Sequence, residues 1–168
     1  MIDNTARTRA ARLAASLLVA LFVPLGATGV AHADIGTGSA GFGQNDEQRA
    51  ESIASDYAVG AATVDYRDFD SWQQRLKANT TPQLAAEFDG SAAQLREIIV
   101  PLRWVSTASL LAAKVISSSN GVYQVDVFID STATTTQSPS PVRTTITYKL
   151  TVDRNQGWKI SDVSGNQF

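Results

Sequence analysis

Apolar side chains recur every three or four positions through residues 45–64, which is the spacing of one face of an α-helix. Asn45 precedes this stretch and Gln48 lies three residues later, an arrangement typical of a capping box at a helix start. The pattern therefore predicts a long amphipathic helix that begins at Asn45. Its buried face consists of Ala50, Ile53, Ala54, Tyr57, Ala58, Ala61 and Val64.

Shorter helical stretches follow an aromatic connector over residues 66–69. A helix with Trp72 and Leu76 on its buried side is expected to be capped by Asp70 or Ser71. Both are residue types that accept hydrogen bonds from the free N–H groups of a first helical turn.

Threonine followed by proline at positions 81 and 82 is a strong signal for a helix start, because proline fits the first helical position. This helix is expected to stop at Gly90. Leu95, Ile98 and Ile99 predict one more helical stretch, which Pro101 ends.

From residue 103 onward the apolar period changes from 3.6 to two, the period of a β-strand. Asn120-Gly121 and residues 155–157 are turn signals, and residues 131–141 are expected to form a Ser/Thr/Pro loop without a core residue. The predicted strands, of which the first is either one long strand or a bent pair, cover residues 104–118, 122–130, 145–152 and 158–163.

Helices followed by strands with short connections indicate an α+β domain with an antiparallel meander sheet. The long helix is expected to lie across a curved sheet and to form a cone with a pocket between them. The alternation in the third strand assigns its residues to two faces. Ile146, Tyr148, Leu150 and Val152 are expected to face the helix, and Thr145, Thr147 and Lys149 to face solvent.

The first 33 residues have the layout of a secretory signal peptide. Arg7, Arg9 and Arg12 precede an apolar run over residues 13–23, and Ala31-His32-Ala33 forms an A-x-A cleavage site before Asp34. The alternative is an uncleaved anchor, because residues 13–30 are 18 uncharged positions, long enough to span a bilayer. The predicted division is a signal peptide or anchor (1–33), a glycine-rich flexible tether (34–45) and one folded domain (46–168).

Charge and composition exclude several functions. Without the three arginines and Asp3 of the predicted leader, the chain carries 11 basic and 15 acidic side chains, a net charge of −4. Such a domain is a poor nucleic-acid ligand, because phosphate neutralisation needs clustered Lys and Arg. The chain has no cysteine and its single histidine is His32. Ser-His and Cys-His nucleophile pairs are thereby excluded from the mature chain, and zinc is disfavoured. We expect no catalytic residue, metal or cofactor.

Carboxylates are the remaining candidates for chemistry. Asp65, Asp68 and Asp70 lie within six positions and could form a calcium site or an acid–base pair. The stretch lacks the glycine and the terminal glutamate of an EF-hand loop, so solvated loop charges and a helix cap are the favoured interpretation. Asp56 beside Tyr57 could act as a lone base, although a carboxylate on a helix flank is more often exposed.

Three aromatic residues, Tyr57, Trp104 and Tyr148, fall on predicted inward faces. They could line a lipid or steroid pocket or simply fill the core, as aromatic residues usually do. Phe128 falls on the polar face of its strand, where an exposed aromatic could mark a partner surface.

The chain resembles the Mce-associated membrane proteins of mycolic-acid-bearing actinobacteria over residues 47–163. The resemblance rests on the helix leading into the sequence YRDFD at 66–70, the Thr81-Pro82 helix start and the closing strand GWKISDV at 157–163. It implies an NTF2-like (cystatin-like) or VirB8-like extracytoplasmic cone, with N-terminal helices packed on a curved four-stranded antiparallel sheet. Members of that family usually keep an uncleaved N-terminal span, whereas this chain has a cleavage site.

The same resemblance implies an accessory role beside Mce transporters, which move lipids or sterols across the envelope, and it supplies no catalytic residues. The leading hypothesis is therefore an exported, non-enzymatic accessory protein of the cell envelope that contacts transport-complex proteins. It would be secreted, or membrane-attached if residues 13–30 are retained. One alternative is a periplasmic carrier that holds a small apolar ligand in its cone. An NTF2-like isomerase with an aspartate base is disfavoured because its usual acid–base partners are missing.

Overall fold

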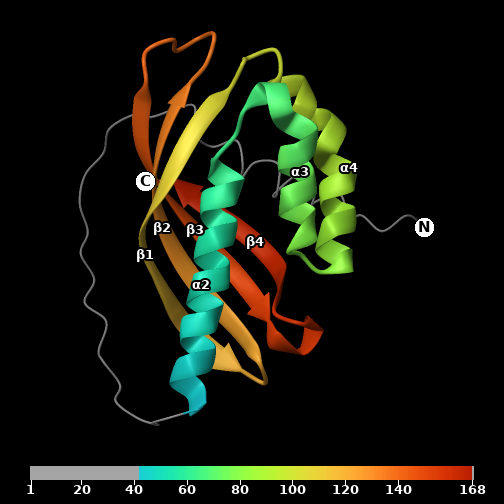
Figure 1. Ribbon diagram of the computed structural model, residues 1–168, viewed down its shortest axis with the longest axis vertical. Helices are drawn as coiled ribbons and strands as arrows, with labels where there is room; N and C mark the ends of the chain where they lie inside the picture. The colour runs from blue at the N-terminus through green and yellow to red at the C-terminus, as the bar shows by residue number, and fades with distance from the viewer. Residues whose placement is uncertain (1–41, 168) are drawn as a thin grey trace.

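The computed structural model describes residues 42–167 (Figure 1), so the predicted signal peptide and most of the predicted tether lie outside the described residues. Three α-helices come first: α2 (Phe42–Ala62), α3 (Phe69–Ala78) and α4 (Pro82–Ile99). A 3₁₀ turn, η2 (Tyr66–Asp68), joins α2 to α3. The strands are β1 (Val105–Ser119), β2 (Val122–Thr134), β3 (Val142–Asp153) and β4 (Lys159–Gln167), with η3 (Arg154–Gln156) before the last.

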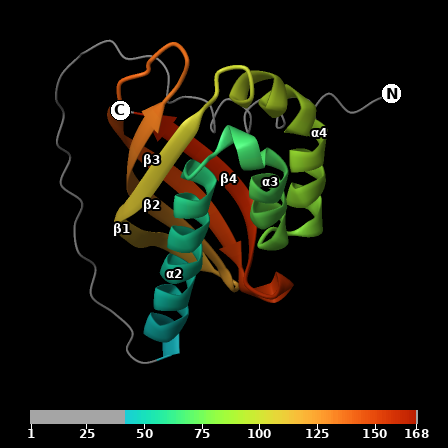
Figure 2. The ribbon, with the colours of Figure 1, turned by 45° about the horizontal axis from the view of Figure 1, so that its top comes forward.

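The four strands form one antiparallel sheet in the order β1-β2-β3-β4. The three helices lie on one face of this curved sheet (Figures 1 and 2). Helix α2 packs along β1, β2 and β3, whereas α3 and α4 form a pair of which α4 contacts β4. The predicted α+β class, with helices packed on a four-stranded antiparallel sheet, is confirmed.

The core lies between the helices and the inner face of the sheet. Alternate residues of β2 and β3 point inward with less than a tenth of their surface exposed, as the period of two requires. Small alanines on α2 allow this helix to approach the sheet closely. The larger buried side chains include Tyr57, Trp72, Leu84, Phe88, Leu95, Trp104, Val125, Val127, Ile129, Tyr148, Leu150, Val152 and Ile160.

Two predicted helix starts need correction. Helix α2 already begins at Phe42, so Asn45 lies inside it and does not cap it. Helix α3 begins at Phe69 with Asp68 at its cap position, so the capping role expected for Asp70 or Ser71 is wrong. The start of α4 is confirmed, because the Thr81 side chain accepts a hydrogen bond from the Leu84 N–H at 3.4 Å.

The predicted helix end at Gly90 is wrong, because α4 runs through it to Ile99. A glycine inside a helix costs only about 1 kcal/mol relative to alanine. The buried face on either side, formed by Phe88, Ser91 and Leu95, continues without interruption. This continuous burial outweighs the local cost of Gly90.

The sheet corrects two further expectations. Strand β2 extends to Thr134, and Ser131 and Thr135 are buried, so the segment expected to lack core residues contributes to the interior. Thr147 was expected to face solvent but is only 5% exposed. It lies on the outer face in register with Phe128.

The predicted turns are confirmed. Asn120 and Gly121 join β1 to β2 with φ angles of 52° and 79°, the left-handed conformations that a tight hairpin requires. Gly157 ends η3 at φ 75°, and Trp158 follows at φ 63°. Trp158 therefore precedes β4 rather than opening it as predicted.

Candidate functional site

The interior of the cone is filled by the aromatic residues that the sequence placed there. Trp104 and Tyr148 line a cavity between the upper part of α2 and the sheet, together with Trp72, Ile99, Ser106 and Ser131. Its volume is about 20 Å³, which is the space of a single water molecule rather than of a lipid.

Tyr57 lies close to Tyr148, and both rings are buried. Burial, and secondarily the neighbouring Tyr148, raises the pKa of Tyr57, and burial raises the pKa of Tyr148. Both phenols therefore stay protonated at neutral pH, which makes them poor general bases. Among residues 42–167, the Tyr57 hydroxyl and the Trp104 Nε1 have no hydrogen-bond partner.

A second hollow lies between α2 and α3 and is open to solvent, with a volume of about 300 Å³. Tyr57 and Leu76 form part of its wall, and Asp56 and Arg75 lie beside them. Asp56 is exposed. The hollow therefore does not enclose the carboxylate of Asp56 in the apolar surroundings that tune a general base.

Each aspartate of the 65–70 stretch pairs with an arginine at the surface. Asp65 contacts Arg67 at 2.6 Å and accepts its backbone N–H. The hydrogen bonds from Arg67 lower the pKa of Asp65 to about 2. The Asp68 carboxylate lies 3.4 Å from Arg75, and its pKa is lowered mainly by a hydrogen bond from Ser71.

Asp70 pairs with Arg96 of α4. The Asp65 carboxylate thus caps the 3₁₀ turn and Asp70 joins two helices, whereas Asp68 stands at the start of α3 without a side-chain capping hydrogen bond. Nowhere in the described part of the chain do three acidic, His or Cys side chains gather as a metal site would need. This geometry agrees with the interpretation of Asp65 and Asp68 as loop charges but not with a capping role for Asp70.

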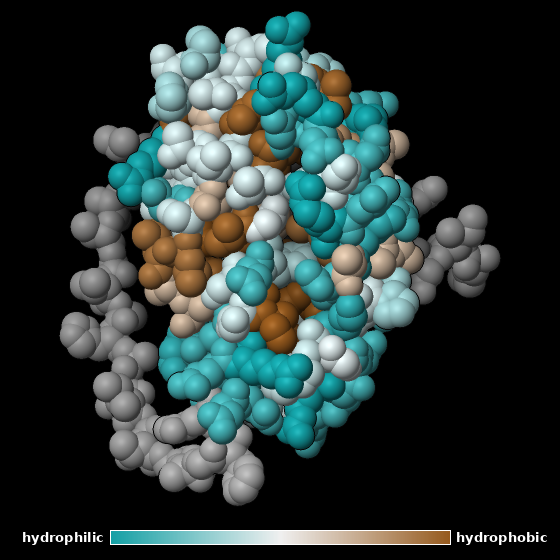
Figure 3. Space-filling view, viewed as in Figure 1, coloured by the Kyte–Doolittle hydropathy of each residue, from teal (hydrophilic) through white to brown (hydrophobic). Residues whose placement is uncertain are grey.

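Apolar exposure on β1 was not predicted from the sequence, which indicated only one long strand or a bent pair over residues 104–118. Leu110, Leu111 and Ile116 are 47%, 55% and 51% exposed. Two bulges interrupt the pairing of β1 with β2, between Leu110 and Ala112 and between Val115 and Ser117. The space-filling view shows a hydrophobic patch along the edge that β1 occupies (Figure 3). The adjacent leucines, which break the alternation, were the signal that could have revealed this patch.

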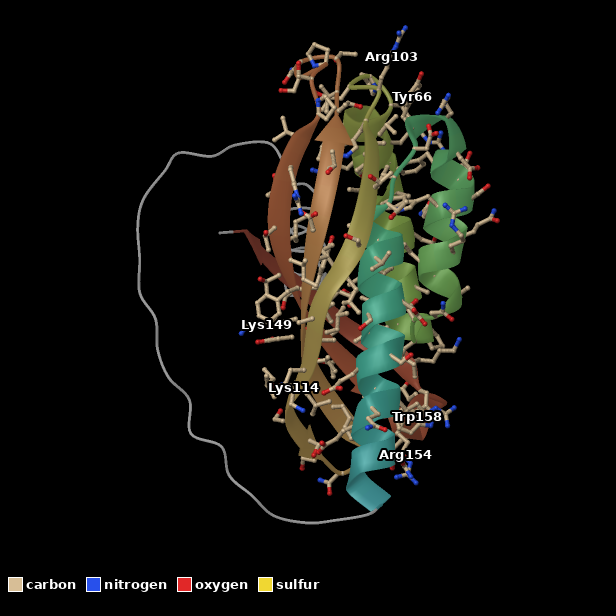
Figure 4. The ribbon with its side chains drawn as sticks, turned by 60° about the vertical axis from the view of Figure 1, so that its left-hand side comes forward. Tyr66, Arg103, Lys114, Lys149, Arg154 and Trp158 are labelled. Carbon is tan, nitrogen blue, oxygen red and sulfur yellow. The ribbon has the colours of Figure 1, made fainter. Side chains whose placement is uncertain are left out.

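Phe128 lies on the outer face of β2, as predicted, and is 37% exposed. Its register partner on β1 is Ala112, so the exposed ring adjoins the β1 patch. No helix covers this face of the sheet in the part of the chain that the structure describes (Figure 4). Within the same residues, no helix is both long enough and apolar enough to cross a membrane.

Comparison with known proteins identifies the class of fold. No protein-family model and no curated protein matches the sequence. Solved structures do match: the periplasmic domain of DotI has a TM-score of 0.58 at 15% identity, covering 70% of this chain and 93% of that one. An IcmL-like type IV secretion system protein from Legionella pneumophila also reaches a TM-score of 0.58, at 14% identity, covering 78% and 96%.

CagV, a VirB8 homolog of the T4SS of Helicobacter pylori, matches with a TM-score of 0.54 and 13% identity, covering 73% of this chain and 99% of that one. The chain therefore has the fold of the VirB8-like, NTF2-like domains. At these identities the likeness establishes the fold alone. The resemblance to the Mce-associated family stays a prediction.

Proposed function

We propose that this chain is an exported, non-enzymatic accessory protein that acts by contact within a multiprotein transport complex of the cell envelope. The observation that carries the proposal is the filled interior. Tyr57, Trp104 and Tyr148 are buried between the helices and the sheet, and a cavity of only about 20 Å³ remains beside Trp104 and Tyr148. Function then has to come from the surface, where β1 exposes three large aliphatic side chains.

Two further observations support this proposal. The solved structures that share the fold include a periplasmic domain and two proteins described as parts of type IV secretion systems. The sequence resemblance points to the finer assignment, an accessory of an Mce-type lipid or sterol transporter. Under this assignment the partners are envelope transport-complex proteins.

Ligand pockets usually measure about 300–1,000 Å³. The carrier alternative therefore requires either that the cavity beside Trp104 opens by more than ten times its present volume or that the solvent-open hollow of about 300 Å³ between α2 and α3 holds the ligand. The two functions differ in what the purified protein holds. Solvent extraction of protein from the native host, followed by lipid mass spectrometry, should recover no stoichiometric lipid. One bound lipid per chain would favour the carrier.

The functional test is complementation of a deletion strain, with lipid uptake and transporter-subunit levels as readouts. Deletion should lower the abundance of the partner complex, since a subunit that binds only the folded state stabilises it by mass action. Asp56→Asn, Asp65→Asn and Asp68→Asn should each restore both readouts, because contact through a surface depends more on apolar anchors than on rim charges. An Asn variant that behaves like the deletion, at normal protein level and melting temperature, would establish a carboxylate mechanism instead.

Export is the second testable part of the proposal. The three arginines, the apolar run over residues 13–23 and the A-x-A site predict cleavage after Ala33. Mass spectrometry of the protein from the native host should therefore find Asp34 at the N-terminus. Recovery of residues 13–30 in the membrane fraction, still attached to the folded domain, would show an anchored protein.

A further inference from the structure

Strand β1 has a stretch whose backbone groups make no hydrogen bonds to other described residues on the side away from β2, and two contacts mark the ends of this stretch. In residues 42–167 it has a strand neighbour on one side, namely β2. On the other side Val64 and Ser106 exchange two backbone hydrogen bonds of 3.2 and 2.8 Å. Further along, the Val115 N–H donates to Glu51 Oε1 at 3.0 Å. Residues 107–113, called the β1 window below, lie between these contacts.

The β1 window is long enough for strand pairing. Seven residues correspond to about 23 Å at the usual rise of a strand, and ordinary strands have five or six residues. Helix α2 packs against β1, but no backbone hydrogen bond or bridge to a described residue is made on the free side of the window. The outward-facing N–H and C=O groups of an edge are a template for another strand.

The window lacks most of the protection that sheet edges usually carry. Natural edges are blocked by charges, prolines or bulges, and residues 107–113 contain neither a charge nor a proline. The nearest charge, Lys114, is paired with Glu51 at 3.3 Å and lies beyond the window (Figure 4). The bulge at Leu111 increases the local twist, yet it also leaves the Leu111 side chain 55% exposed at the edge.

Apolar side chains border the window on both faces of the sheet. Leu110 is in register with Ile129, whose side chain points to the helix-covered face. Ala112 is in register with Phe128 on the outer face. An added strand would contact both faces at once, because its side chains alternate. A helix laid against one face would leave the other side exposed.

We propose that the β1 window accepts an extended, uncharged, apolar strand of a partner protein, which adds a fifth strand to the sheet. The strand is uncharged because the window offers no free charge to pair with. Backbone hydrogen bonds supply affinity, and apolar side chains on both faces supply selectivity. This inference rests on the proposed function, since it names the surface through which the accessory contact is made.

The test measures amide hydrogen exchange of the full chain with a capped seven-residue peptide of alternating threonine and valine. Amides in the β1 window should exchange about tenfold more slowly with saturating peptide, because paired edge amides open only with the strand. The same peptide N-methylated along one edge should give no protection, since it cannot donate the ladder hydrogen bonds.

Leu111→Lys should abolish the protection by placing a charge at the edge. Ile116→Lys is the matched control, because Ile116 is equally exposed on the same strand but lies beyond the Glu51 contact. Equal protection by the methylated peptide, or equal loss in both variants, would overturn the proposal. Protection that appears without peptide and rises with protein concentration would also overturn it, in favour of pairing between two copies.

The deletion strain separates this inference from the proposed function. If deletion lowers the partner complex but Leu111→Lys leaves it at the normal level, the β1 window is not the contact and the accessory role stands. If deletion has no effect, the accessory role fails, and the peptide experiment alone decides whether the window accepts a strand.

Discussion

The Tyr57 hydroxyl is buried without a hydrogen-bond partner among the described residues. Desolvating a polar group without a replacement bond costs about 1–3 kcal/mol. Tyr57→Phe removes the hydroxyl and keeps the ring, so it should raise the free energy of unfolding by about 1 kcal/mol in urea denaturation. Tyr66→Phe is the control and should change stability by less than about 0.5 kcal/mol, because Tyr66 is half-exposed. A clear loss of stability in Tyr57→Phe would mean that the hydroxyl is bonded in solution.

At the residue scale the sequence predicted the face to which a side chain points better than it predicted the neighbours and free space around that side chain. The inward positions of Tyr57, Trp104 and Tyr148 followed from helical and strand periodicity, and the structure buries all three. The size of the cavity beside them could not follow, because it depends on how side chains from four elements interlock. The same reason applies to Thr147, whose burial on the outer face depends on its surroundings in other strands, among them its register partner Phe128.

Strand β3 offers a direct test of register at the scale of an element. Leu150 is 1% exposed, and the adjacent Lys149 is exposed on the opposite face. Leu150→Ala should lower the free energy of unfolding by about 2–5 kcal/mol, because it leaves a cavity in the core. Lys149→Ala should stay within about 0.5 kcal/mol of the parent protein. Similar losses in the two variants, measured by urea denaturation, would show that the register of β3 is wrong.

Helices and strands were predicted correctly where the apolar pattern extends over many residues. Their ends were predicted wrongly where packing against other elements determines where a helix or strand stops. The four strands and the long helix follow from sustained apolar patterns. The passage of α4 through Gly90 does not, because burial of the flanking turns outweighs glycine's low helix propensity. The extension of β2 to Thr134 was also missed, since pairing with β1 and β3 stabilises a polar stretch that has no strand pattern of its own.

On the scale of the whole molecule, the helices cover one face of the sheet, with α2 beside β1, and leave the other face without a helix among the described residues (Figure 2). The core requires apolar side chains at the inward positions of each helix and strand, but several apolar residue types can fill each position. The fold can therefore be shared with solved domains at 13–15% identity. The β1 window instead exposes particular apolar side chains, Leu110 and Leu111. We therefore infer that partner choice is encoded at the edge and that the core encodes only the fold.

Stability of the whole domain should fall at alkaline pH because burial raises the pKa of both Tyr57 and Tyr148. In the unfolded chain a tyrosine has a pKa of about 10. Below that pH both tyrosines are protonated in the folded and in the unfolded protein, so their ionisation does not lower the free energy of unfolding. Above pH 10 the unfolded chain releases two protons that the folded protein retains, so unfolding becomes more favourable. Well above pH 10 each buried tyrosine should contribute a fall of about 1.4 kcal/mol per pH unit, and between pH 9 and 11 a fall of about 1.4 kcal/mol in all.

Urea denaturation of the parent protein between pH 9 and 11 should reveal this slope, and Tyr148→Phe should reduce it by the share of one tyrosine. The comparison between variants cancels the titration of lysines, which is common to both. Tyr57→Phe should reduce the slope by a similar amount, and the double variant should lose both contributions. Equal slopes in the parent and in Tyr148→Phe would show that the Tyr148 phenol ionises as readily in the folded domain as in the unfolded chain. The interior would then be open to water, and the carrier alternative would regain its physical basis.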